Sequence, residues 1–187
     1  TIDLRHGMES FQILEKHLDN FPGIKLHSTL KEAIVYHDDK SYKASLQKPV
    51  YSVPFLLSTA DDLDAFGVIG SFRYAEIYLL RGVRITDLGA LVQKNLGDRF
   101  KNFQLGFNKF HSLIKEQQKR YHGTYNVFAS ASGEFLKILE HLIIDEKYSI
   151  YDLMNDHEQA NSELRTFTNQ LKTEWNRFDM IINNYED

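Results

Sequence analysis

Three aspartates, Asp61, Asp62 and Asp64, stand within four positions of the segment STADDLDAFGVIGSFR, which covers residues 58–73. Two glycines and then Arg73 follow them, and no lysine lies at helical spacing from any of the three. The residues on both sides are apolar, so the segment is expected to form an apolar helix. Carboxylates in such a setting need cations or hydrogen-bond donors as partners. The segment therefore predicts a site at which acids meet such groups.

Two histidines that precede this segment could join Asp61 in binding a divalent metal ion. His6 is expected to open one helix and His37 to close the next, and imidazole and carboxylate are ligands that such ions accept. Two plainer interpretations stay open. His37 could cap the C-terminal end of its helix, where the macrodipole favours a cation. His6 could be a solvated residue.

The pattern of apolar residues predicts the helices that would position these groups. Stripes at spacings of three and four predict helices over 8–18, over about 28–37 and from Ser52 toward residue 80, with Pro54 in the first turn. The third is expected to bend at Gly67 or Gly70 and to end at Gly82. Another helix is expected from residue 87 with residue 86 as its cap, and breaks are expected at residues 123 and 129–133. No alternation of period two lasts long enough to predict a sheet, so the fold is predicted to be all-α.

Composition narrows the function classes. The 187 residues carry a net charge of −4, which gives no strong nucleic-acid signal. The absence of cysteine excludes thiolate chemistry and disulfides. No apolar run is long enough to span a membrane, and the first residues do not form a signal peptide. A cytoplasmic location is therefore the default expectation.

The sequence resembles the C-terminal part of HD-domain superfamily metal-dependent phosphohydrolases. Three blocks carry the resemblance, in matching order and with matching gaps: HGMES at 6–10, LKEAIVYH at 30–37 and ADDLDAFGVIGSFR at 60–73. They are similar to the family patterns H-x-x-x-S, I-x-x-A-I-x-x-H and A-D-R-L-D-A-I-G-A-I-G-x-x-R. The third block is the most specific. The match is clear from residue 6 to about residue 80, fades over 103–144 and does not cover 156–187.

The resemblance implies an HD-type helical bundle that holds divalent ions and hydrolyses phosphate esters, often of nucleotides. It implies that Asp61 is a catalytic metal ligand, joined by His6 and His37, and that the metal is Mn, Mg, Fe, Co or Zn. Arg73 would bind substrate phosphate or pair with an acid, and Asp64 would give structural support. A bound divalent ion lowers the pKa of its water and neutralises phosphoryl oxygens.

Two departures from the family pattern bear on this site. The family has arginine where Asp62 stands, which alters the local charge. The family's first histidine and its His-Asp doublet lie upstream of the first block, where this sequence has no counterpart. His37 and the aspartate after it could instead be the doublet, but only 24 positions then separate His37 from Asp61. That is too few for the family's intervening helices, so the later-histidine assignment is favoured. A missing N-terminal segment, a second chain or a homodimer could complete the site.

We therefore expect an HD-type helical domain over 1–145 and a C-terminal helical extension over 146–187. The stripe in the extension could pack on its own domain or on a partner helix; its residues are Leu164, Phe167, Leu171, Trp175, Phe178 and Ile182. The basic run from Lys115 to Arg120 is typical of a solvated helix face, with binding of nucleotide phosphate as the alternative. The expected function is metal-dependent hydrolysis of a small phosphate ester, most often a nucleotide. The alternative is a non-catalytic HD-type scaffold that senses a ligand or binds a protein.

Overall fold

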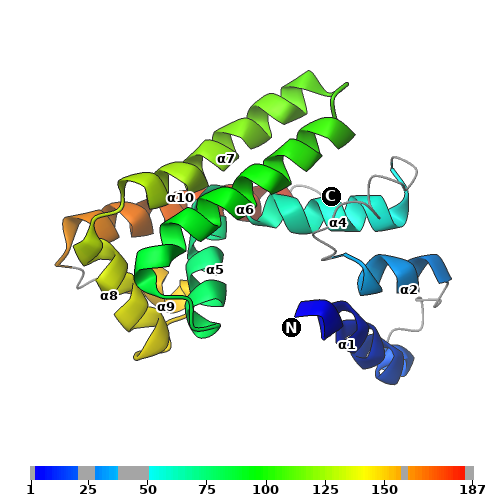
Figure 1. Ribbon diagram of the computed structural model, residues 1–187, viewed down its shortest axis with the longest axis horizontal. Coiled ribbons are helices and arrows are strands. Elements are labelled where there is room, and N and C mark those ends of the chain that lie inside the picture. Colours follow the sequence, from blue (N-terminus) through cyan, green and yellow to red (C-terminus); the bar gives the residue numbers. More distant parts are fainter. Residues whose placement is uncertain (1–2, 21–27, 38–50, 157–159, 184–187) are drawn as a thin grey trace.

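The computed structural model describes residues 3–20, 28–37, 51–156 and 160–183, and over these the chain is helical and forms no strand. The all-α prediction is thus confirmed. The elements, labelled as in Figure 1, are α1 (Asp3–Lys16), the 3-10 turn η1 (Leu18–Asn20), α2 (Ser28–Val35), α4 (Val53–Asp64), α5 (Gly67–Leu80), α6 (Ile85–Gly106), α7 (His111–Ser130), α8 (Gly133–Ile144), α9 (Ile150–Asn155) and α10 (Ser162–Asn183).

The segment with the three aspartates lies at the junction of α4 and α5. Ser52 caps α4 because its hydroxyl accepts a hydrogen bond from the Phe55 backbone N–H at 3.4 Å, and Pro54 occupies the first turn. The helix predicted from Ser52 toward residue 80 is interrupted at the expected place. α4 ends at Asp64, and α5 begins at Gly67, whose φ of +92° suits glycine. The acids therefore stand on the last turn of one helix, beside the start of the next.

Two predicted helix boundaries are wrong. Thr86 is not a cap, because α6 already begins at Ile85 and its N-cap, Arg84, makes no side-chain cap bond. Gly123 does not interrupt a helix but lies inside α7, where a Cβ atom built on it would stand 3.9 Å from the Gly67 Cα. Position 123 of α7 therefore lies against the start of α5, with room for a Cβ atom. The break expected over 129–133 is correct, since Ser132 caps α8.

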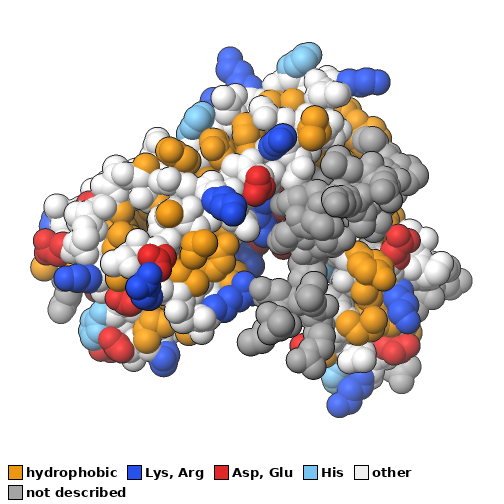
Figure 2. All heavy atoms as spheres, in the orientation of Figure 1, with side chains coloured by type: hydrophobic (Ala, Val, Ile, Leu, Met, Phe, Trp, Pro, Cys, Tyr) orange, Lys and Arg blue, Asp and Glu red, His pale blue; other side chains and the backbone are white. Residues whose placement is uncertain are grey.

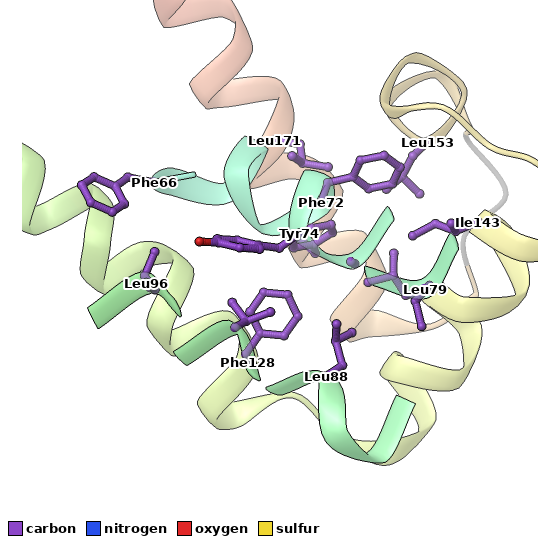
Figure 3. Close-up of a cluster of buried hydrophobic side chains, with 14 of the residues drawn as sticks. Phe66, Phe72, Tyr74, Leu79, Leu88, Leu96, Phe128, Ile143, Leu153 and Leu171 are labelled. Carbon is purple, nitrogen blue, oxygen red and sulfur yellow. The ribbon is translucent and has the colours of Figure 1, made fainter. Parts of the chain in front are cut away.

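The hydrophobic core is built around α5. Helices α6, α7, α8 and α10 pack against it, and α6 and α7 lie side by side as a long antiparallel pair (Figure 1). Figure 3 shows core side chains that α5 to α10 and the turn before α5 supply; the labelled ones are Phe66, Phe72, Tyr74, Leu79, Leu88, Leu96, Phe128, Ile143, Leu153 and Leu171. Helices α1 and α2 pack on each other, and α2 also contacts α4.

The C-terminal helices share this core. Leu153 and Met154 of α9 are buried in it, as are Leu164, Phe167 and Leu171 of α10. The apolar stripe of the last helix thus packs on its own domain over the residues whose side chains are described; the side chains of residues 178 and 182 lie outside them. The core continues across the boundary expected at 145/146. None of the helices described is both long and apolar enough to cross a membrane.

Candidate functional site

Arg99 of α6 meets two of the three aspartates. Its Nη1 donates to Asp62 Oδ1 at 2.9 Å, to Asp61 Oδ2 at 3.3 Å and to the Asp61 backbone oxygen at 2.9 Å. The Asp62 side chain is only 6% exposed and the Arg99 side chain 11%, whereas Asp61 keeps 32% of its side-chain surface exposed. A largely buried arginine therefore pairs with two carboxylates of this segment. Carboxylates in apolar surroundings need such a partner.

The Arg99 guanidinium is oriented by a second layer of hydrogen bonds. Its Nε donates to Asn95 Oδ1 at 2.9 Å, and the Tyr74 hydroxyl donates to the same oxygen at 2.8 Å. The Tyr74 ring centroid is 6.0 Å from the centre of the guanidinium. Three helices thus fix one arginine: α4 through its acids, α5 through Tyr74 and α6 through Asn95.

The third aspartate has a different cation. Asp64 pairs with Arg73 of α5, and both side chains are about half exposed. The pair joins the end of α4 to α5, and the substrate-binding role expected for Arg73 stays a prediction. Because the pair faces solvent, an incoming phosphate could compete for Arg73 at a lower cost than for the buried Arg99.

The expected site residues Asp61, Asp64 and Arg73 line one small hollow with Arg99 and Tyr74. Its volume is about 60 Å³. Sites that enclose a whole small-molecule ligand measure roughly 300–1,000 Å³. The hollow therefore has room for a group of phosphate size, and the rest of an ester would extend beyond it.

The two histidines lie together on α1 and just after α2. Their ring centroids are 5.3 Å apart in an edge-to-face arrangement. His37 Nδ1 hydrogen-bonds the Ile34 carbonyl oxygen at 2.6 Å, which satisfies an acceptor in the last turn of α2. His6 is exposed. Both arrangements match the plainer interpretations of these residues.

The described residues do not gather the three metal ligands that were expected. Within the ranges described, no three His, Cys, Asp or Glu side chains form a group that could hold a metal ion. His6 and His37 contact each other, while Asp61 contacts Arg99. As a donor set, these residues do not fit a complete metal site. Asp61, with its partly exposed carboxylate, is the one expected ligand that lies at the hollow.

Sequence reasoning missed Arg99, although a signal for it exists. Residues 88, 92, 96, 100 and 103 form the buried stripe of α6, and Arg99 follows Leu96 by three positions. A cation beside a buried stripe indicates an acid partner elsewhere in the fold. Pairing that cation with the acids of residues 61–64, for which no lysine stands at helical spacing, would have found the contact.

The surface carries mixed charge. On the face in Figure 2, the basic and acidic side chains of the described residues are interspersed rather than gathered in a patch of one sign.

Comparison of the chain with models of known protein families, with curated protein sequences and with solved structures found no match.

Proposed function

We propose that this chain forms the phosphate-binding part of an HD-type, metal-dependent phosphohydrolase acting on a small phosphate ester such as a nucleotide. One observation carries the proposal. Asp61, Asp64 and Arg73, to which the family resemblance gives roles, line a single hollow of phosphate size. Their places in the sequence do not require this, because Arg73 lies on a different helix from the two acids.

Each residue of the hollow has a defined part in this proposal. Arg73 binds a phosphate oxygen, since a guanidinium forms strong charge-assisted hydrogen bonds with phosphate. Asp64 orients Arg73 through their ion pair. Arg99 holds the turn of α4 that carries Asp61.

Of the three expected metal ligands, all of them among the described residues, only Asp61 lines the hollow. Asp61 would supply one carboxylate ligand, and a bound divalent ion would supply an activated water. The remaining ligands would have to come from outside the described residues, for example from a second chain.

A second function is favoured by one specific observation. Arg99 pairs with both Asp61 and Asp62 and so gives each carboxylate a cationic partner without any metal. That arrangement suits a non-catalytic HD-type scaffold, in which the acids stabilise the junction of α4 and α5 and the domain senses a ligand or binds a protein.

A pair of measurements on the full-length protein separates the two functions. We would titrate Mn²⁺ by calorimetry and follow hydrolysis of p-nitrophenyl phosphate and of nucleotides in its presence. The enzyme proposal expects Mn²⁺ binding and turnover that are both lost in Asp61→Asn. They should be retained in the matched control Asp87→Asn, which changes an exposed acid paired with Arg84. Absence of both Mn²⁺ binding and turnover in the wild type would leave the scaffold function.

A further inference from the structure

A large groove lies between α7 and α10, with the start of α5 as its floor. Its volume is about 750 Å³, within the range of small-molecule sites. It shares no lining residue with the hollow around Asp61. The residues that line it are Gly67, Val68, Glu116, Gln117, Lys119, Arg120, Gly123, Thr166, Asn169, Gln170, Thr173, Glu174 and Arg177.

The floor of the groove is fixed by Glu174 and Arg120. Glu174 Oε2 accepts hydrogen bonds from the backbone N–H groups of Val68 at 2.5 Å and Ile69 at 3.1 Å. Arg120 donates from Nη2 to the Phe66 carbonyl oxygen at 2.7 Å and lies 3.4 Å from Glu174 Oε1. Both side chains are mostly buried. These two charges therefore belong to the framework of the groove rather than to its open rim.

The rim carries exposed cations. The Lys119 side chain is 68% exposed and the Arg177 side chain 63%, and both meet Glu116, at 3.6 Å and 2.8 Å. Across the lining, three basic residues face two acids, although the whole chain has a net charge of −4. Lys119, from the basic run on α7, and Arg177 of α10 are therefore the exposed cations that a ligand in the groove can reach. The local charge favours an anionic group at this end.

The other end of the groove combines apolar and polar side chains. A second hollow of about 440 Å³ adjoins the first and shares Val68, Gly123, Thr166 and Gln170 with it. Its walls include the apolar side chains Val127, Phe135 and Phe167, beside the polar residues Asn126, Ser130, Ser162 and Glu163. Residues 116–123 of α7 line the first hollow with 166–177 of α10, and residues 123–130 line the second with 162–170. The two helices thus run in opposite directions along a groove that has its basic side chains at one end and the apolar side chains of Val127, Phe135 and Phe167 at the other.

We propose that this groove binds a small organic anion, with Lys119 and Arg177 meeting its phosphate or carboxylate group and its apolar or aromatic body lying toward Val127. Polar side chains also line the groove, namely Gln117, Asn169, Gln170, Thr166 and Thr173, and of these Thr166 and Gln170 line both hollows. Lys119 and Arg177 share the single carboxylate of Glu116. A phosphate or carboxylate of the ligand can therefore replace Glu116 as a partner of these two cations. This inference does not rest on the proposed hydrolysis.

The test uses AMP as a phosphate probe with an aromatic body and octanoate as a carboxylate probe with an apolar body. Binding to the full-length protein is measured by calorimetry and mapped by amide chemical shifts. We expect at least one probe to bind saturably and to shift amides of both α7 and α10. Adenosine, which lacks the phosphate, is expected to bind about tenfold more weakly than AMP if AMP binds.

The decisive variant is the double substitution Lys119→Gln and Arg177→Gln, which should weaken binding by about tenfold or more. The double substitution Lys115→Gln and Arg165→Gln is its control, because it removes the same charges from the same two helices outside the groove. The control should bind as the wild type does. Failure of both probes to bind, or equal binding by the groove variant, would overturn the proposal. A thermal melt of each variant checks that it is folded.

Discussion

Glu163 and Glu174 lie about three turns apart on α10, and each carboxylate caps the start of another helix. Glu163 accepts hydrogen bonds from the backbone N–H of Ser132 at 3.0 Å and from its hydroxyl, at the start of α8. Glu174 accepts from the first N–H groups of α5, whose N-cap residue, Phe66, makes no side-chain cap bond. Two side chains of α10 therefore accept hydrogen bonds at the starts of α5 and α8, which lie far from α10 in the sequence.

Glu174→Ala should expose the start of α5. Two backbone N–H groups would lose their acceptor and Arg120 its carboxylate partner, at a cost of about 1–3 kcal/mol in the free energy of unfolding. Urea denaturation measures this cost, and hydrogen exchange reports the amides directly. Exchange at Val68 and Ile69 should become faster.

Glu163→Ala is the reciprocal control for that experiment. It should speed exchange at Ser132 and leave the amides of Val68 and Ile69 protected, because its contacts are at α8. Equal protection of the α5 amides in Glu174→Ala and in the wild type would contradict the capping role.

Gly67→Ala should be more costly than Gly82→Ala. Both glycines have positive φ, +92° and +78°, so alanine brings a backbone cost of about 1–2 kcal/mol at either position. A Cβ atom at position 67 would also overlap the Glu174 carboxylate. A Cβ atom at position 82 would have no other atom of the described residues within 4 Å, apart from its chain neighbours. The difference between the two unfolding free energies isolates the displacement of Glu174.

The background of Glu174→Ala gives the check on this argument. With the carboxylate gone, Gly67→Ala should cost only as much as Gly82→Ala. If Gly67→Ala keeps its larger cost in that background, the overlap with Glu174 is not its cause.

Local chemistry explains which parts of the fold the sequence could predict. Ser52 followed by Pro54 predicts the start of α4, and glycine at 67 predicts the break before α5, because each acts on its own few residues. Thr86 misled for the same reason. It is a good cap in isolation, but the helix begins at Ile85, one residue before it.

The contacts of the candidate site lie mostly beyond such local signals. Arg99 is 37 positions from Asp62, and Glu174 is 106 positions from Val68. Periodicity predicts which face of a helix is buried but not which helix it meets. The pairing of Asp64 with Arg73 is easier to predict from the sequence, because only nine positions and one helix junction separate the two residues. The metal ligand set and the hydrolase function remain proposals.

Arg99→Leu should destabilise the protein strongly. It would leave Asp62 buried without its cation, and removing one partner of a buried ion pair costs about 3–5 kcal/mol. Arg84→Leu is the matched control, since Arg84 pairs with Asp87 in an exposed position worth at most about 1 kcal/mol. Urea unfolding of both variants gives the comparison. Similar small losses for the two would mean that Asp62 does not depend on Arg99.

Replacement of Arg177 should change the titration of Glu116. The hydrogen bond from the Arg177 guanidinium at 2.8 Å lowers the pKa of Glu116 below its ordinary value of 4.5, and Lys119 adds a smaller effect in the same direction. A carboxylate whose pKa is lowered in the folded state stabilises the fold above its unfolded pKa. That stabilisation is lost as the pH falls through the folded pKa.

Arg177→Gln should therefore raise the pKa of Glu116 toward 4.5, and Lys119→Gln should raise it less. Carboxyl-detected NMR titration measures both shifts. The stability advantage of the wild type over Arg177→Gln should be present at neutral pH and should shrink as the solution is acidified below about pH 4.5. An unchanged pKa of Glu116 in Arg177→Gln would show that this guanidinium does not hold the carboxylate in solution. Arg177 would then already be free to meet a ligand in the groove.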